Sequence, residues 1–364
     1  MAEINRFFIE QYRGINNLRI EQLNQVNLIV GDNNCGKTSV LEALQLFRTS
    51  GDLANVYRIA RQRESIFGVN SNSIYENFIC MFPHDGSNLE IRISGECNGN
   101  EISFDLKGTQ EKVLIDSKEL NRFVLREMED ISEELETDTF DGLISFQYGK
   151  GGREEKISIN RFSRLSGTPM SKSDEFAIVY VSPFEHLKGN TIGRIIRNDG
   201  YKEICLKALQ LFDSDIEDMM IFRSDIGNRP VEYLKHKRLG NMPLSTFGDG
   251  IKKVLVLSNA IARAAGGILL IDEIETAIHK KYYDDIFRFI IKACRAFDVQ
   301  VFITTHSLEA IDGLLATQDY EEQKTEDSIS VVTLKREENN TYSRVLSGRE
   351  VAQNREAFGF EVRL

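Results

Sequence analysis

Residues 26–47 read VNLIVGDNNCGKTSVLEALQLF, and this stretch decides the fold class. Its first part, 26–30, is a short uninterrupted apolar run, which predicts a buried β-strand. Its last part, 38–47, places apolar side chains at helical spacing, as expected of a helix packed on a sheet. These side chains are Val40, Leu41, Leu44 and Phe47. A strand that leads through a glycine-rich turn into a helix predicts an α/β fold.

The turn between the strand and the helix carries a phosphate-binding pattern. Gly31, four residues and then Gly36-Lys37-Thr38 match the P-loop motif, in the strand-then-helix context that the motif requires. The glycines allow a tight turn whose N–H groups point at phosphate oxygens, and the helix N-terminus adds partial positive charge. Lys37 supplies a cation for the β- and γ-phosphates, and Thr38 supplies an oxygen for Mg²⁺. The residues expected to bind the nucleotide in this loop are Gly31, Asn33, Asn34, Gly36, Lys37, Thr38 and Ser39.

A second apolar strand ends in two acids. GGILLIDE (266–273) has the form of a Walker B strand, since a P-loop protein needs a carboxylate for its metal ion and a second one beside the attacking water. Asp272 is expected to hold Mg²⁺, and Glu273 is expected to orient or deprotonate the water.

A histidine follows the next apolar strand. The sequence predicts a helix over 282–294 and a buried strand in VQVFITTHS (299–307), which ends at His306. Two parallel strands joined by one helix are expected to be neighbours, with their carboxyl ends at the edge where ligands bind. His306 is therefore expected to reach the γ-phosphate. Lys37, Glu273 and His306 form the predicted catalytic set.

Residues 242–257, MPLSTFGDGIKKVLVL, place Ser and Gly in front of an amphipathic helix. One interpretation is a loop with a helix N-cap. The other is a second anion-binding surface made by a Ser hydroxyl and glycine N–H groups at a helix N-terminus. Because the chain already has one complete phosphate cradle, the simplest use of a second one is toward the nucleotide of another molecule.

Composition limits the classes of function. The chain of 364 residues is 41% hydrophobic and 28% charged, as expected of a soluble globular protein. Its formal net charge of −11 means that only local basic patches can bind nucleic acid, and the basic runs at 58–63 and 235–238 are either such patches or solvated surface. We expect no signal peptide and no membrane helix. The five scattered cysteines favour a reducing cytoplasm over a zinc module.

The stretch 51–178 is expected to insert mostly antiparallel structure. Alternating residues predict a hairpin over 89–108 around Asn98-Gly99-Asn100 and another over 144–160 around Gly151-Gly152. An acidic amphipathic helix is predicted over 118–138, either as a solvated face or as a docking surface. Asp213 and Asp215 resemble a metal-binding acid pair, but their place between a helix and a strand favours a simple connection.

These motifs, in this order, resemble an ABC-type ATPase head, and more narrowly the RecF/SMC side of that superfamily, including the ATPase portion of OLD-family proteins. The resemblance covers about 3–48 and 205–315 and a closing segment. It implies a P-loop NTPase fold with a mixed, largely parallel sheet, an antiparallel β subdomain and a helical lobe. It also implies that Ser245, Gly248, Asp249 and Gly250 form a signature motif, although Thr246 and Phe247 separate the serine from the first glycine. In that family the signature of one protomer contacts the γ-phosphate held by the P-loop of the other.

The expected organisation is a single composite head over 1–364. Its parts are a P-loop lobe (1–50), the inserted β and helical segment (51–178), a helical lobe (179–240), the signature, Walker B and histidine lobe (241–320) and C-terminal strands with a short helix (321–364). Gln147 is one candidate for the glutamine that couples nucleotide to the helical lobe, while the strand at 179–181 ends at an equivalent place without one.

The resemblance implies an ATPase that uses ATP and Mg²⁺ and dimerises, or forms a higher homo-oligomer, around the nucleotide. It is expected to handle DNA or another nucleic acid, or to control a separately encoded, nuclease-like effector, in bacterial anti-phage defence, because the chain carries no Toprim nuclease domain. Two alternatives remain open: a nucleotide-gated sensor or scaffold that holds a partner, and a DNA repair or recombination clamp.

Overall fold

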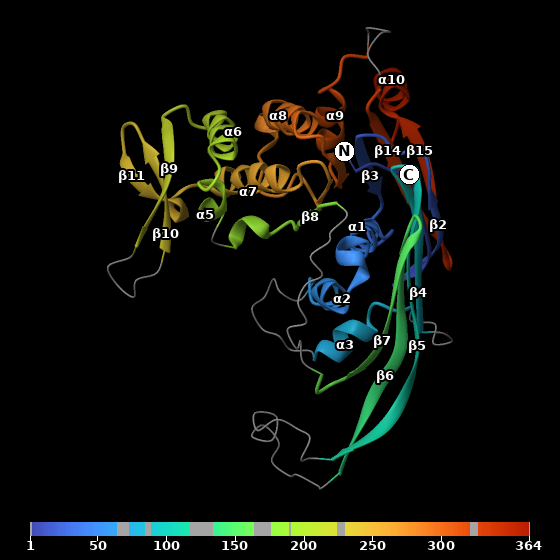
Figure 1. Ribbon diagram of the computed structural model, residues 1–364. Coiled ribbons are helices and arrows are strands. Elements are labelled where there is room, and N and C mark those ends of the chain that lie inside the picture. The colour runs from blue at the N-terminus through green and yellow to red at the C-terminus, as the bar shows by residue number, and fades with distance from the viewer. Residues whose placement is uncertain are drawn as a thin grey trace.

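The computed structural model describes residues 2–63, 73–83, 89–116, 134–163, 176–188, 191–223, 230–320 and 327–363 of the chain. Figure 1 shows the core sheet at the upper right, an antiparallel sheet running downward from it, and a small third sheet at the far left. The described helices include none that is both long and apolar enough to cross a membrane. All five cysteines are free thiols.

The core is a six-stranded mixed sheet in the order β15-β14-β3-β13-β12-β8. Strands β14, β3, β13, β12 and β8 run parallel, and β15 runs antiparallel to β14. The bounds are β15 Asn340–Ser347, β14 Ile329–Glu337, β3 Val26–Gly31, β13 Gln300–Thr304, β12 Ile268–Ile271 and β8 Ile178–Val181. The predicted α/β fold with parallel strands is confirmed, and the P-loop strand β3 lies inside the sheet.

Helices cover both faces of this sheet because its central strands are apolar on both sides. In β3, Leu28 and Val30 pack with the side that carries α7 (Asp249–Arg263), α8 (Tyr283–Ala296) and α9 (Leu308–Leu315). Ile29 packs on the other side, with the P-loop helix α1 (Lys37–Gln45). The short helix α10 (Gly348–Phe358) follows β15, so the predicted pair of C-terminal strands and the helix after them are confirmed.

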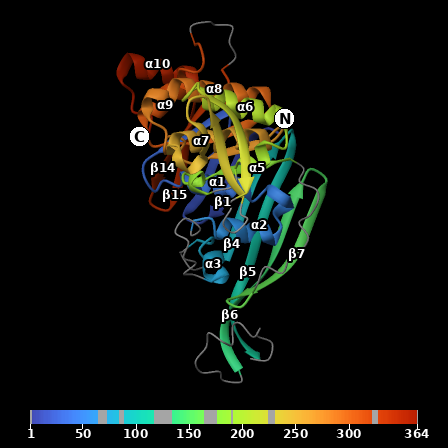
Figure 2. The same ribbon diagram turned by 90° about the vertical axis from the view of Figure 1, so that its left-hand side faces the viewer.

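The second sheet is antiparallel, with six strands in the order β2-β1-β4-β5-β6-β7. Its bounds are β1 Ile4–Tyr12, β2 Ile15–Ile20, β4 Leu89–Cys97, β5 Asn100–Asp116, β6 Glu134–Tyr148 and β7 Gly151–Asn160. One face shares a core with α1, α2 (Leu53–Ala60) and α3 (Ile74–Ile79). Figure 2 shows β5 and β6 running on below the other strands as a two-stranded ribbon. The predicted hairpin over 89–108 is confirmed.

Three local predictions differ from the structure. The stretch FFIEQYRGI (7–15), whose sequence alone reads as one strand, contains the turn at Arg13-Gly14 between β1 and β2. The second hairpin turns at Gly149-Lys150, two residues before the predicted place. The acidic helix predicted over 118–138 lies mostly outside the described residues, but 134–138 belong to β6 and pair with β5, so that end is not helical.

A third, three-stranded sheet occupies the region expected as a helical lobe. Strands β9 (Ile216–Arg223), β10 (Pro230–His236) and β11 (Gly240–Pro243) form it, in the order β11-β10-β9. Two helices, α5 (Ile192–Ile195) and α6 (Asp199–Gln210), share a small core with β9, β10 and Leu255 of α7. This lobe is therefore helical only in part, and α7 connects it to the core sheet.

Short 3-10 turns complete the described elements. They are η1 Arg48–Gly51, η3 Glu185–Leu187, η4 Leu244–Thr246 and η5 Lys280–Tyr282.

Candidate nucleotide site

The P-loop adopts backbone angles that glycine permits. Gly31 has φ of 142° and Gly36 has φ of 102°. A Cβ at Gly31 would run into the carbonyl oxygen of Leu334 in β14, so the neighbouring strand approaches the loop too closely for any side chain. Asn34 also has a positive φ, 62°, which asparagine tolerates better than most residues. The loop is thus shaped before any ligand binds.

The Lys37 side chain lies inside the loop. Its Nζ donates to the carbonyl oxygens of Gly31 and Asp32, both at 2.7 Å, and lies 3.6 Å from the Cys35 sulfur. Burial lowers the pKa of Lys37. Cys35 is 3% exposed, as expected of a small side chain that fills the inside of the loop.

Asp272 is a buried carboxylate surrounded by hydroxyl groups. It follows β12 and is 4% exposed. Thr38 Oγ1 donates to it at 3.1 and 3.2 Å, Thr304 Oγ1 at 2.6 Å and Tyr180 OH at 3.1 Å. These hydroxyls come from α1, β13 and β8, so the carboxylate joins the P-loop helix to both neighbouring strands. A buried carboxylate that meets only neutral donors suits a hard cation.

Glu273 has strained backbone geometry beside His306. Its φ is 47°, which is unusual for a residue with a side chain and is characteristic of functional sites. The Glu273 N–H donates to Thr304 Oγ1 at 2.8 Å, and its carboxylate lies 3.8 Å from His306 Nε2. Both side chains are more than a third exposed, so they face solvent at the sheet edge.

His306 is held through its main chain. Its N–H donates to Glu275 Oε1 at 2.7 Å, and its carbonyl oxygen accepts from Arg363 at 2.9 Å. Strand β13 ends at Thr304, two residues earlier than expected, so His306 lies in the turn toward α9. These two contacts fix the backbone of His306, while its partly exposed imidazole lies beside the Glu273 carboxylate.

The predicted P-loop, Walker B and histidine residues meet at the carboxyl edge of the core sheet. Sequence reasoning missed Tyr180, Thr304 and Arg363. The sequence indicates the role of Thr304 only weakly, because a threonine at the end of a buried apolar strand needs a hydrogen-bond partner. The sequence does not indicate the role of Arg363, since this residue contacts His306 from 57 residues away in the chain.

A buried ion cluster fixes α1 behind the P-loop. Glu42 is 0% exposed and accepts from Arg13 at 2.8 Å and from Arg63 at 2.7 Å. Arg63 also donates to Ser39 Oγ at 3.0 Å. In the basic run 58–63, Arg63 is therefore neutralised, and Arg58 donates to Asn55 at 2.6 Å. Two of the three arginines of this run are therefore engaged within the protein.

The signature residues lie on the other lobe. Ser245 is in η4 and Gly248 caps α7, and both are exposed, as is Asp249. Phe247 packs against the small core of the lobe, and Thr246 Oγ1 donates to the Pro243 carbonyl at 2.7 Å. The two intervening residues therefore anchor the loop, and they leave Ser245 and Gly248 open to solvent.

Gly250 begins the part of α7 that meets the core domain. A Cβ there would lie 3.3 Å from the Ala277 carbonyl, in the turn that follows Glu273. Asp249 forms an ion pair with Lys252 at 2.9 Å, and this contact lowers the pKa of Asp249. The start of α7 is thus held both by its own ion pair and by close approach to the Walker B turn.

The other sequence candidates are placed elsewhere. Gln147 lies in β6 of the antiparallel sheet, where it lines a hollow with Arg6 and Arg19, so it is not part of the P-loop site. In the second basic run, Lys235 pairs with Glu217 and Arg238 pairs with Asp215.

Lys253 of α7 is a buried cation behind the Walker B acids. It is 0% exposed, and its Nζ donates to the Pro183 carbonyl at 3.3 Å. Burial lowers the pKa of Lys253 to about 8, and the charges of Asp272 and Glu275 oppose part of that shift. No ion pair among the described residues involves Lys253, so its charge is a cost to folding.

Replacing Lys253 with Met should therefore stabilise the protein at pH 7, by about 1–3 kcal/mol. The unfolded chain keeps an ordinary lysine pKa, so it binds more protons than the folded protein between about pH 8 and pH 10. The free energy of unfolding of the wild type should rise with pH across this window, and the advantage of the variant should disappear. Urea unfolding of the wild type and of Lys253→Met, at pH 7 and at about pH 10, measures this. Lys252→Met, which removes the neighbouring, partly exposed lysine that pairs with Asp249, is the control. A pH-independent difference for Lys253→Met would contradict the prediction.

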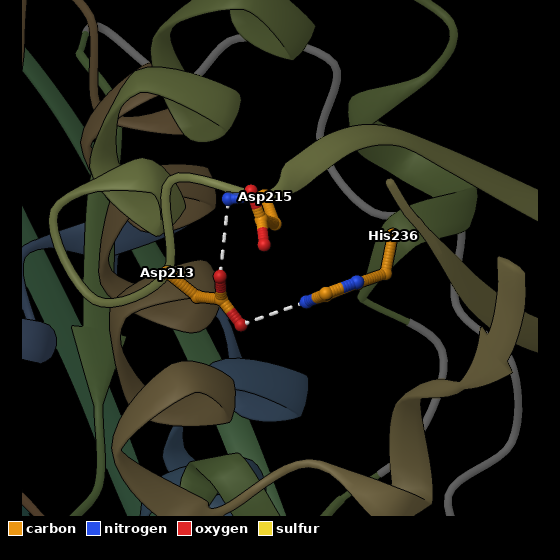
Figure 3. A group of neighbouring side chains, drawn as sticks. All are labelled: Asp213, Asp215 and His236. Atoms are coloured by element: carbon orange, nitrogen blue, oxygen red, sulfur yellow. Dashed lines mark hydrogen bonds and ion pairs between the residues drawn. The ribbon is translucent and has the colours of Figure 1, made fainter. Parts of the chain in front are cut away.

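A second cluster, Asp213, Asp215 and His236, brings possible metal ligands within 4.8 Å (Figure 3). His236 Nδ1 accepts from the N–H groups of Arg238 and Leu239, at 3.1 and 3.2 Å. Nε2 therefore carries the proton and donates to Asp213 at 3.1 Å, so it has no lone pair for a metal. The cluster ties the α6–β9 turn to the β10–β11 turn, in agreement with the expected connecting role of Asp213 and Asp215.

A parallel core sheet with a P-loop, a Walker B pair and an inserted antiparallel sheet defines a P-loop ATPase head of the ABC type. The likeness to SMC heads that the sequence indicated is thereby seen in the fold. The chain belongs to the family described as AAA domain, putative AbiEii toxin, Type IV TA system, whose family model matches residues 26–312.

Individual proteins of known sequence or structure are also similar to this chain. A Helicobacter pylori protein described as an ATP/GTP phosphatase is 24% identical over 344 residues, which covers 86% of this chain and 89% of that protein. An uncharacterised Methanocaldococcus jannaschii protein is 31% identical over 119 residues, covering 32% of this chain and 99% of its own. The crystal structure of an SMC head bound to the C-terminal winged-helix domain of ScpA has a TM-score of 0.50 at 12% identity, over 96% of this chain and 99% of that one. This last likeness concerns the fold alone.

Proposed function

We propose that this protein binds ATP with Mg²⁺, closes into a head-to-head homodimer around two ATP molecules, and reopens when the ATP is hydrolysed. The exposure of Ser245, Gly248 and Asp249 at the start of α7 carries this proposal. A hollow of about 330 Å³ lies beside Ser245, and its lining includes His186, Lys188 and Lys252 together with Glu232 and apolar side chains. The P-loop belongs to the other lobe, so a partner protomer is the natural source of its γ-phosphate contact.

Within one chain, the P-loop residues are suited to hold the phosphates. Loop N–H groups and the α1 N-terminus attract phosphate oxygens, and Lys37 is expected to exchange its two carbonyl partners for them. Thr38 and Asp272 would hold Mg²⁺, since their oxygens already lie 3.1 Å apart around a buried carboxylate. The ion supplies charge neutralisation for the β- and γ-phosphates.

Glu273 is suited to orient the attacking water and take its proton. The strained backbone points its carboxylate into the open edge next to His306. His306 is suited to contact the γ-phosphate as charge develops on it. ATP hydrolysis at this site would then depend on a dry interface, which closure against a second protomer provides.

Ser245→Arg and Gly248→Asp should each abolish ATP-driven dimerisation and leave ATP binding by the monomer intact. Lys37→Ala should instead lose ATP binding, because it removes the cation in the P-loop. A mixture of Lys37→Ala and Ser245→Arg protomers should regain part of the ATPase activity, since one composite site then has both halves intact. Light scattering and phosphate release measure these outcomes. If the mixture stays inactive while Ser245→Arg alone binds ATP, then the signature does not act across a dimer.

We further propose that the closed dimer acts on nucleic acid or on a separately encoded effector, in bacterial anti-phage defence and in the cytoplasm. The family description, which mentions a putative toxin of type IV toxin–antitoxin systems, supports a role in defence. If the dimer acts on DNA, then DNA should stimulate its ATPase activity, and the affinity for DNA should fall steeply as the salt concentration rises.

The second candidate is a nucleotide-gated scaffold that holds a partner protein. The β5–β6 ribbon favours it, because β5 and β6 stay paired as far as Asp116 and Glu134 while β7 stops at the level of Thr139. The ribbon exposes Val113 and Leu114, the latter by 63%. Copurification of a stoichiometric partner that is lost with Leu114→Lys, at unchanged ATPase rate with and without DNA, would select this candidate.

A further inference from the structure

The guanidinium of Arg336 covers the β1–β2 turn. A Cβ at Gly14 would lie 3.2 Å from Nη1 of Arg336 and 3.6 Å from both Cζ and Nη2. These similar distances mean that the planar group lies against the glycine as a whole. The contact exists because position 14 lacks a side chain.

This contact lies beside the P-loop. Leu334 of β14 pairs with Gly31 of β3, where the P-loop begins. Arg336 is two residues further along β14, so it lies beyond that paired position. Ile15, next to Gly14, would lie 3.1 Å from a Cβ at Gly36. The Asn16 side chain donates to the Asn339 carbonyl at 2.8 Å, which ties the β14–β15 turn to the β1–β2 hairpin. Arg336 therefore lies next to the P-loop, on two hairpins that are hydrogen-bonded to each other.

The charge of Arg336 has no acidic partner. None of the ion pairs among the described residues includes it, and the residue is exposed. Two nearby cations do have acidic partners. Lys335 pairs with Glu337 at 3.1 Å, and Arg13 is buried against Glu42. A planar cation with an open face beside a phosphate loop is suited to a ligand.

The order of strands indicates which part of a nucleotide reaches it. Asp272 and His306 follow β12 and β13, on one side of the P-loop strand β3. Strand β14, with Arg336, lies on the other side of β3. If the γ-phosphate points toward Asp272 and Glu273, the nucleoside leaves the loop on the side of β14 and the β1–β2 turn.

We propose that Arg336, supported by Gly14, binds the nucleobase of the nucleotide by stacking its guanidinium on the purine ring. The proposal rests on the P-loop nucleotide binding proposed above. Stacking uses the π-face that every base has, so Arg336 adds affinity for adenine and guanine nucleotides alike and does not choose between them.

Calorimetric titration with ADP, GDP and inorganic pyrophosphate, each with Mg²⁺, tests this, because pyrophosphate lacks the base. Arg336→Ala should raise the Kd for ADP and for GDP roughly five- to tenfold and leave the Kd for pyrophosphate unchanged. Arg336→Lys, which keeps the charge without the plane, should behave like Arg336→Ala. Gly14→Ala should weaken ADP in the same direction, since its new methyl group displaces the guanidinium.

Lys335→Ala is the matched control, and it should leave all three ligands unaffected. An equal loss of ADP and pyrophosphate binding would mean that Arg336 acts on phosphates, which overturns the proposal. So would unchanged ADP binding in Arg336→Ala, full rescue by Arg336→Lys, or the same loss in Lys335→Ala. Failure of the wild type to bind ADP would instead contradict the proposed function.

Discussion

Replacing Glu273 with Gln is expected to slow ATP hydrolysis by about 10²–10³-fold while the protein still binds ATP. The amide keeps the size of the side chain but cannot accept a proton from water. The backbone should be unaffected, because the Glu273 N–H, and not the carboxylate, holds the strained turn to Thr304. If the protein closes around ATP as proposed, unhydrolysed ATP keeps it closed, so the variant should accumulate as a dimer in ATP. Phosphate release and light scattering on the same sample measure both effects.

Glu275→Gln is the matched control for this experiment. It removes an acid from the same turn but keeps an oxygen that can accept the His306 N–H. Its hydrolysis rate should fall less than tenfold. An ATPase rate in Glu273→Gln equal to that of wild type would remove Glu273 from the catalytic set, and an equal loss in both variants would point to the whole turn rather than to one base.

The second large effect concerns stability. Glu42→Ala should lower the free energy of unfolding by about 3–5 kcal/mol, because it leaves the buried Arg13 without its carboxylate. Arg13 is only 11% exposed in its side chain and also donates to the Tyr12 hydroxyl at 3.2 Å. Loss of Glu42 also releases Arg63 from α1, so the P-loop helix should loosen. Urea unfolding of the nucleotide-free protein measures the change.

Glu96→Ala provides the comparison, since Glu96 pairs with Arg6 at 3.0 Å on the surface of the antiparallel sheet. That pair is exposed, and its loss should cost less than about 1 kcal/mol. If the two variants are equally stable, the Glu42 cluster does not hold α1 in place.

Local motifs made the core of the site predictable from sequence. A P-loop is set by the residues of one turn, and Asp272 and Glu273 follow an apolar strand directly, so their chemistry is visible in a short window. The neighbouring position of β13 also follows from a short crossover between parallel strands. For these reasons Lys37, Thr38, Asp272 and Glu273 were predicted together.

The remaining contacts depend on pairings that no short window contains. Tyr180 and Thr304 reach Asp272 from β8 and β13, and their roles depend on strand order. Residues 134–138 carry charges at a spacing compatible with a helix, yet cross-strand pairing with β5 decides their structure. The buried position of Lys253 likewise follows from how α7 packs, which its sequence does not state.

The place of β3 in the core sheet has a consequence for synthesis of the chain. The strand that leads into the P-loop pairs with residues 301–304 on one side and 329–334 on the other. Both of its edges therefore stay unpaired until the ribosome has synthesised nearly three hundred further residues. Until then a flat apolar strand is open to wrong pairing, which favours chaperone binding on the ribosome. The Leu334 carbonyl that packs against Gly31 also arrives late. Nascent chains that stop before β14 should therefore fail to retain nucleotide, which makes ligand binding a check on completed translation.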